Sequence, residues 1–157
     1  MQTIIYNFID KAKWFKGEWQ EEPDKVQWQD EKTKLPCIAV RHKTLGHWCG
    51  YVGVDKSNKL YGHSFGFEFS EPLGELSVHG GVTHTGTCSE DEHGVCHIVE
   101  KGEDDDIWWI GFDCAHLYDY SPNVKDKPVE DEVYKNLDFV KQECGDLAEQ
   151  IIKKKEF

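Results

Sequence analysis

A chain of 157 residues with six Trp, six Tyr and eight Phe is long enough and apolar enough for a single domain, residues 1–157. Its 18 basic and 30 acidic residues give a net charge of −12, which repels phosphates and argues against ordinary nucleic-acid binding. The sequence contains neither an apolar stretch of about 18 residues that would span a membrane nor the features of a signal peptide. We therefore expect a cytoplasmic protein, without membrane or nucleic-acid partners, whose six cysteines are reduced.

The first half of the chain predicts one helix followed by strands. Residues 4–15 carry apolar side chains three and four positions apart, which indicates a short amphipathic helix. Residues 26–29 alternate between apolar and polar side chains, and residues 37–41 follow a turn, so the two segments predict a hairpin. Residues 48–54 predict another strand, in which two glycines indicate a bulge or a close approach of another group.

The second half predicts further strands and one long helix. Short strands are expected at residues 76–79, 82–85 and 95–99, and a buried strand begins at Trp108. A helix from about Glu130 to Lys153 carries an apolar stripe at helical spacing. The predicted class is α+β, an antiparallel sheet covered by an N-terminal helix and a long C-terminal helix.

The strand that begins at Trp108 ends in groups that can hold protons or metals. Asp113, Cys114 and His116 follow a run of aromatic and β-branched residues. Cys114 and His116 lie two positions apart, so we expect their side chains to point the same way and Asp113 to point to the other face. Such a strand end is a candidate site. The alternative, held equally, is a core strand whose last polar residues cap the sheet.

A second candidate lies at His79-Gly80-Gly81. Two glycines after a histidine offer backbone N–H groups to an anion or allow a ligand to approach closely. The alternative is a bulge that needs glycine for its backbone conformation, with the histidine bonded to a carbonyl.

These groups leave three kinds of chemistry open. Cys114 with His116 and Asp113 resembles the set of a nucleophilic hydrolase. His79, Cys114 and His116 are possible zinc ligands. His79, Asp113 and His116 are suited to metal-free acid–base work on a phosphodiester. Because the sequence has no Cys-x-x-Cys pair and no spacing that demands a metal, we expect neither a metal nor a cofactor.

Other residues suit the binding of an anion with an aromatic ring. Arg41, the only arginine, can fork onto a phosphate, although an internal salt bridge is the commoner use of such a residue. Aromatic side chains in the strands offer flat faces for stacking, or simply pack in the core. The predicted ligand-binding residues are Arg41, Cys49, Tyr51, His79, Gly80, Gly81, Trp108, Trp109 and His116.

Several motifs resemble those of an uncharacterised family of small phage and bacterial proteins. The similarity covers residues from about 18 to 152 and implies an origin rather than a particular activity. His47 and His84 depart from the pattern, so we leave them out of the site. The matching motifs are Trp28-Gln-Asp-Glu, Leu35-Pro-Cys37, Cys49-Gly-Tyr-Val-Gly-Val54, Ser77-Val-His-Gly-Gly81, Trp108-Trp-Ile-Gly-Phe-Asp-Cys-Ala-His116 and the segment from Tyr134 to Gln150.

Two classes of function follow. The first is a protein that binds a small anionic, nucleotide-like ligand, which in a phage would act in the host cytosol as an anti-defence sponge for a signalling nucleotide. The alternative is a small hydrolase of such a molecule that uses His79, Asp113, Cys114 and His116 as catalytic residues. A weaker third interpretation is a module that blocks a host factor through its acidic surface.

Overall fold

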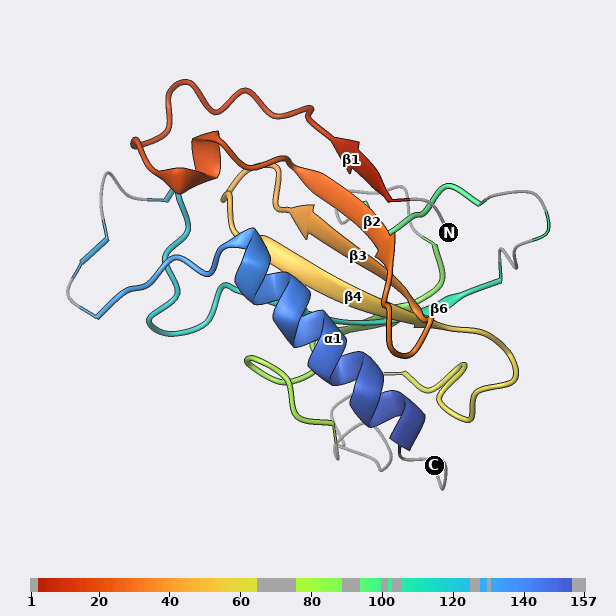
Figure 1. Cartoon of the computed structure of the whole chain (residues 1–157). Coiled ribbons are helices and arrows are strands. Elements are labelled where there is room, and N and C mark those ends of the chain that lie inside the picture. The colour runs from red at the N-terminus through yellow and green to blue at the C-terminus, as the bar shows by residue number, and fades with distance from the viewer. Residues whose placement is uncertain are drawn as a thin grey trace.

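The structure is a computed structural model that describes residues 3–64, 76–88, 94–99, 102, 106–124, 128–129 and 131–153. Within these residues, one antiparallel sheet has the strand order β1-β2-β3-β4-β6-β5, and one helix lies diagonally across a face of it (Figure 1). The predicted α+β class is thus confirmed. The elements are β1 (Ile4–Tyr6), a 3₁₀ turn (Glu18–Gln20), β2 (Lys25–Gln29), β3 (Pro36–Arg41), β4 (Trp48–Val54), β5 (His84–Gly86), β6 (Trp108–Asp113) and α1 (Leu137–Lys153).

The predicted N-terminal helix is wrong. Residues 4–6 form β1, which pairs with β2, and the only helical turn before β2 is the 3₁₀ turn. The carboxylate of the buried Asp24 explains the path that follows, because its Oδ2 accepts the backbone N–H groups of Phe8 and Ile9 at 2.7 Å each. The apolar spacing of this segment fits a helix, but pairing with the free edge of β2 satisfies its backbone instead.

The strands at the centre of the sheet confirm the prediction for residues 26–29, 37–41 and 48–54. β4 pairs with β3 on one side and with β6 on the other. Apolar side chains on both sides of these strands are buried, which is why their sequences run nearly without charges. β4 thereby carries the end of β6, with its Asp113, into the middle of the sheet.

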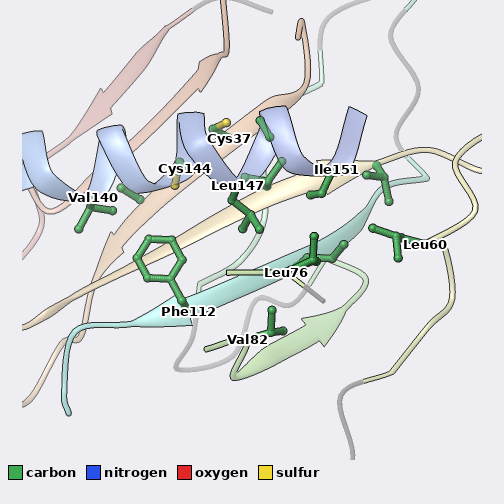
Figure 2. Close-up of a cluster of buried hydrophobic side chains, with 14 of the residues drawn as sticks. Cys37, Leu60, Leu76, Val82, Phe112, Val140, Cys144, Leu147 and Ile151 are labelled. Carbon is green, nitrogen blue, oxygen red and sulfur yellow. The ribbon is translucent and has the colours of Figure 1, made fainter. Parts of the chain in front are cut away.

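Helix α1 begins at Leu137, later than the predicted start near residue 130. Asn136 caps it, since its Oδ1 accepts the N–H of Phe139 at 2.9 Å. The apolar stripe of α1 packs on the sheet (Figure 2). Gly50 of β4 allows this approach, because a Cβ atom there would lie 2.9 Å from Sγ of Cys144. None of the described helices is long and apolar enough to cross a membrane.

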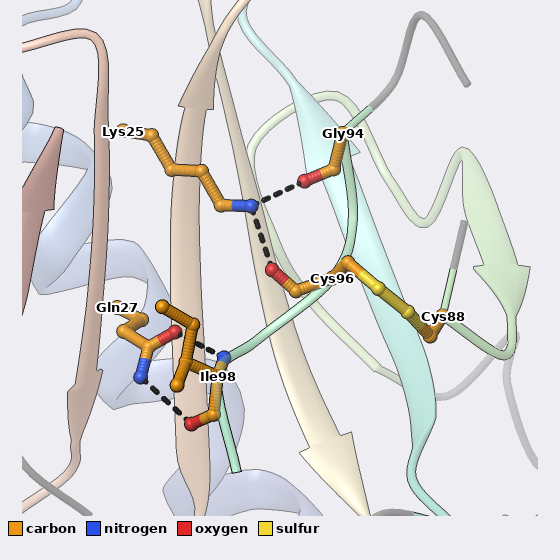
Figure 3. Close-up of a disulfide and its surroundings, with 6 residues drawn as sticks. All are labelled: Lys25, Gln27, Cys88, Gly94, Cys96 and Ile98. Atoms are coloured by element: carbon orange, nitrogen blue, oxygen red, sulfur yellow. Dashed lines mark hydrogen bonds between the residues drawn. A yellow bond between two sulfur atoms is a disulfide. The ribbon is translucent and has the colours of Figure 1, made fainter. Parts of the chain in front are cut away.

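The opposite face of the sheet is covered by irregular chain. Residues 95–98, predicted to lie in a strand, run across it without strand pairing. Gln27 of β2 bonds the N–H and carbonyl of Ile98, while Lys25 Nζ donates to the carbonyl oxygens of Gly94 and Cys96 at 2.8 and 2.6 Å (Figure 3). Cys96 forms a disulfide with Cys88, so the expectation that all six cysteines are reduced is wrong for this pair.

The segments predicted as strands between β4 and β6 are shorter than expected. Residues 76–79 form no strand, and residues 82–85 contribute only the start of β5, which spans His84–Gly86. Gly80 and Gly81 break the pairing, because both adopt positive φ values of 70° and 81°. The chain turns here instead, with the N–H of Gly81 donating to the carbonyl of Val78 at 2.8 Å.

Replacing Leu147 by Ala tests the packing of α1. Leu147 is fully buried between the helix and the sheet, so Leu147→Ala should lower the free energy of unfolding by roughly 2–5 kcal/mol. Ile152→Ala is the matched control, because the Ile152 side chain is 37% exposed and should change stability much less. Urea unfolding measures both; equal losses would mean that α1 does not pack as described.

Candidate functional site

Two histidines that are 37 residues apart in the sequence meet at one edge of the helix-covered face. His79 enters through the turn at Gly80 and Gly81, and His116 lies in the loop after β6. Their rings are 5.8 Å apart between centroids and nearly perpendicular. Gly80 makes this possible, because a Cβ atom at that position would overlap the imidazole of His116.

A buried carboxylate holds both histidine segments. Oδ2 of Asp119 lies 2.8 Å from Nε2 of His79 and accepts the backbone N–H of His116 at 3.0 Å. Lys135 Nζ lies 3.2 Å from the other oxygen. Burial raises the pKa of Asp119, but the bonds from His79, His116 and Lys135 outweigh it and hold the pKa below its usual value. Asp119 is therefore an anion at neutral pH, and it holds the His79 ring in place.

His116 has a carboxylate of its own. Its Nε2 lies 3.1 Å from Oδ1 of Asp113, and both side chains are about one-third exposed. The sequence predicted that Asp113 and His116 point to opposite faces, and this prediction requires an extended chain. The chain leaves β6 after Asp113 and bends back, so the pair becomes adjacent. We call His79, Asp113, His116 and Asp119 the two-histidine cluster.

Cys114 does not belong to this cluster. Its side chain is 1% exposed and packs in the core between the sheet and α1, whereas His116 reaches the surface. The two side chains thus do not share one side, contrary to the prediction. Burial raises the pKa of the Cys114 thiol, and burial with the nearby Asp113 charge raises the pKa of Cys49 to about 12. Neither thiol is poised as a nucleophile at neutral pH.

The geometry also gives no support to the zinc interpretation. Among the residues that the structure describes, no group of three or more His, Cys, Asp or Glu side chains is arranged to hold a metal ion.

Arg41 lies away from the cluster and is fully buried. Its guanidinium is 3.3 Å from Oε1 of Glu22 and 3.4 Å from Oδ1 of Asp24, donates to the Gly46 carbonyl at 2.7 Å, and lies 4.5 Å from the centre of the Trp48 ring. These internal partners leave no surface for a ligand. The geometry therefore favours the internal salt bridge over the predicted anion anchor.

The aromatic residues predicted to wall the site are also elsewhere. Tyr51 and Trp109 are buried on the sheet face opposite α1, against the rings of His84 and His97 respectively. Trp108 is next to Trp109 in β6, and adjacent residues of a strand point to opposite faces, so Trp108 lies on the α1 side. Its Nε1 donates to the carbonyl of His63. The predicted residues that meet in the cluster are His79, Gly80, Asp113 and His116, with Gly81 beside them in the turn.

Residues that the sequence interpretation missed complete the surroundings of His79. Phe139 of α1 packs edge-on against its ring at 5.2 Å, and Glu143 accepts its backbone N–H at 3.0 Å. Asp119 could have been found from the sequence, because Asp113 and Asp119 lie three positions before and three positions after His116. Lys135 and the two helix residues had none. An open groove of about 610 Å³ runs from His79 along α1, past Glu143, Asp146 and Glu149.

Comparison of the chain with protein-family models, curated proteins and solved structures finds no match. The interpretation of the cluster therefore depends on its own chemistry.

Substitution of Arg41 separates the two interpretations of this residue. Arg41→Ala leaves the carboxylates of Glu22 and Asp24 without their buried cation and should lower the free energy of unfolding by roughly 3–5 kcal/mol. Arg41→Lys should also lower it, since one ammonium group cannot replace the planar fork. Thermal and urea unfolding measure the effect. A melting temperature equal to that of the parent in the Lys variant would contradict the structural role.

Asp119 predicts a pH dependence of stability. Its pKa is lower in the folded chain than in the unfolded chain, whose value is about 3.9, so its contribution is complete above that value and is lost as the pH falls through the folded pKa. The Asp119→Asn variant should be less stable at pH 7 and should lose less further stability on acidification. Unfolding curves between pH 7 and pH 2 measure this. Asp55→Asn is the control, because the exposed Asp55 bonds only within its own turn and the variant should follow the parent curve.

Proposed function

We propose that this chain binds a small anionic, nucleotide-like molecule at the two-histidine cluster and hydrolyses it by metal-independent acid–base chemistry. One observation carries the proposal: two imidazoles lie 5.8 Å apart, each has its own carboxylate, and their side chains are 22% and 34% exposed. Of the other polar groups predicted for the site, Arg41 and Cys114 are buried, and the half-buried Cys49 packs on the sheet face opposite α1.

The two rings contact each other edge to face, so a phosphoryl group would lie beside the pair rather than between the rings. Nε2 of His79 is bonded to Asp119, whereas Nε2 of His116 lies 3.1 Å from Oδ1 of Asp113 but is buried and lacks hydrogen-bond geometry to it. In the proposed site, Nδ1 of each ring contacts the ligand. In hydrolysis, one neutral imidazole accepts a proton from water as the water oxygen bonds to phosphorus. The other ring, as imidazolium, donates a proton to the leaving oxygen as its bond to phosphorus breaks. One proton is taken up and one is released, so exchange with water restores both rings.

The carboxylates assist this chemistry in different ways. Asp119 is buried and bonded to three groups, so it orients His79. Asp113 is partly exposed and orients His116. Lys135 offsets the charge of Asp119, which lowers the repulsion that a bound anion would meet.

A second candidate is capture of the same ligand without turnover, as expected of a phage sponge for a host signalling nucleotide. Burial of Cys114 and its raised pKa remove the covalent route, because the thiol predicted as the nucleophile is protonated, and capture does not need such a group. Under this proposal, the imidazoles act only as hydrogen-bond donors to the anion.

One experiment separates the two candidates. The protein is incubated with cyclic AMP, cyclic GMP, a cyclic dinucleotide and ADP-ribose in the presence of a chelator, and the contents are analysed by chromatography after heat release. Conversion of a nucleotide supports the hydrolase, and retention of an intact nucleotide supports capture. If no nucleotide is bound or altered, the proposed function is wrong.

His116→Ala is the variant that tests the cluster. The His116 side chain contacts its surroundings mainly through Asp113 and the Gly80 backbone, so the fold should survive its removal. A hydrolase should lose turnover by roughly 100-fold or more while still binding nucleotide, whereas a capture protein should lose affinity severalfold. His63→Ala is the control, because the exposed His63 bonds Trp108 only through its backbone carbonyl. Parent-like behaviour of His116→Ala would exclude the cluster.

A further inference from the structure

The loop that joins the two halves of the cluster has an unusual tip. The N–H of Asp119 donates to the carbonyl of His116 at 2.9 Å, so residues 116–119 form a tight turn. Leu117 and Tyr118 occupy its two central positions, and they are 81% and 55% exposed. Turn tips normally carry Gly, Asn or Asp, because these residues are polar or tolerate the backbone conformation.

Tyr118 is held in a backbone conformation that disfavours it. Its φ is 70°, in the left-handed region where a bulky side chain crowds its own backbone and glycine does not. The conformation is fixed on both sides, because the Tyr118 carbonyl accepts the N–H of Val133 at 2.8 Å and the next residue, Asp119, is anchored to His79. The turn therefore requires this conformation but does not itself require a tyrosine.

We propose that Tyr118, supported by Leu117, is the surface on which the aromatic base of the ligand stacks while its phosphate lies at His79 and His116. This inference rests on the proposed function and adds the substrate class, a base-bearing nucleotide rather than a sugar phosphate. An exposed aromatic ring gives up little conformational entropy on binding and offers a flat face to any base. Backbone strain beside a binding cluster is a recurrent feature of functional sites.

The charge around the cluster supports an aromatic contact rather than further ionic ones. The groove beside His79 is lined by three carboxylates, Glu143, Asp146 and Glu149, and by one cation, Lys153, which pairs with Glu149. The excess of negative charge repels a second anionic group. The tip of the 116–119 turn carries only uncharged side chains, and the neighbouring Val133 is 55% exposed. A ligand with one anionic end and one apolar, planar end matches both surroundings.

The test compares probes with and without a base. Cyclic AMP and ADP-ribose carry the base, and ribose 5-phosphate is the base-free probe; binding is measured by calorimetric titration. The parent should bind at least one base-bearing probe more tightly than ribose 5-phosphate by at least about 5-fold. Tyr118→Phe should keep this ratio, and Tyr118→Gly should reduce it to about one.

Stability measurements exclude a purely structural role. Because glycine adopts φ of 70° freely, Tyr118→Gly should keep the parent melting temperature or raise it by up to about 4 °C. Lys34→Gly is the matched control: Lys34 also has a positive φ, of 65°, in a turn remote from the cluster. Lys34→Gly should likewise keep or raise the melting temperature, and it should leave the ratio between base-bearing and base-free binding unchanged.

The outcomes distinguish the inference from the function beneath it. If base-bearing and base-free probes bind equally, or if Tyr118→Gly keeps the ratio, the stacking role is wrong and the phosphate site stands. If Tyr118→Gly melts well below the parent while Lys34→Gly does not, Tyr118 is structural and the inference is overturned. If none of the probes binds, the proposed function and the inference are both wrong.

Discussion

The buried guanidinium of Arg41 is the constraint on which the arrangement of this fold depends. Removing such a charge from water is costly unless it is bonded on every side. Arg41 meets most of this requirement through Glu22 before β2, the Gly46 carbonyl before β4 and the hydroxyl of Tyr134 before α1. Its Nε has no hydrogen bond but lies 3.4 Å from the carboxylate of Asp24. Residues 22–24 and Tyr134, which are distant from Arg41 in sequence, are thereby drawn to the same end of the sheet as the turn at Gly46.

Glu22 extends this constraint to the helix. Its second oxygen accepts the N–H of Leu137 at 2.7 Å, so the buried ion pair also stabilises the first residue of α1. The position of the helix start places Phe139 in the first turn and Glu143 in the second turn of α1, where they contact the ring and the backbone of His79. The candidate site is thus connected to the buried charge through α1, although Arg41 itself does not reach it.

The two-histidine cluster brings together polar groups from two loops. Each of its two histidines would be an ordinary surface residue alone, but Asp119 bonds both segments and Gly80 lets the rings approach. In the same loop, Leu117 and Tyr118 are exposed to solvent and do not pack in the core. The distribution of burial therefore separates residues that stabilise the fold from residues that stay accessible at the surface.

The sequence by itself determined the α+β class, the central strands, the apolar stripe of the C-terminal helix and the position of Asp113 and His116 at the end of a buried strand. These features depend on local periodicity and on residue types that only a few environments accept.

Tertiary structure decided the rest. The spacing of residues 4–15 fits a helix, yet an available strand edge made β1 of its start. The side chains of Cys114 and His116 would share a face only if the chain stayed extended. The chain bends after Asp113, so Cys114 is buried and His116 is partly exposed. Whether Arg41 served a ligand or the core depended on which carboxylates the fold brought to it, because a side chain's partners are set by pairing across the sheet and not by its neighbours in sequence.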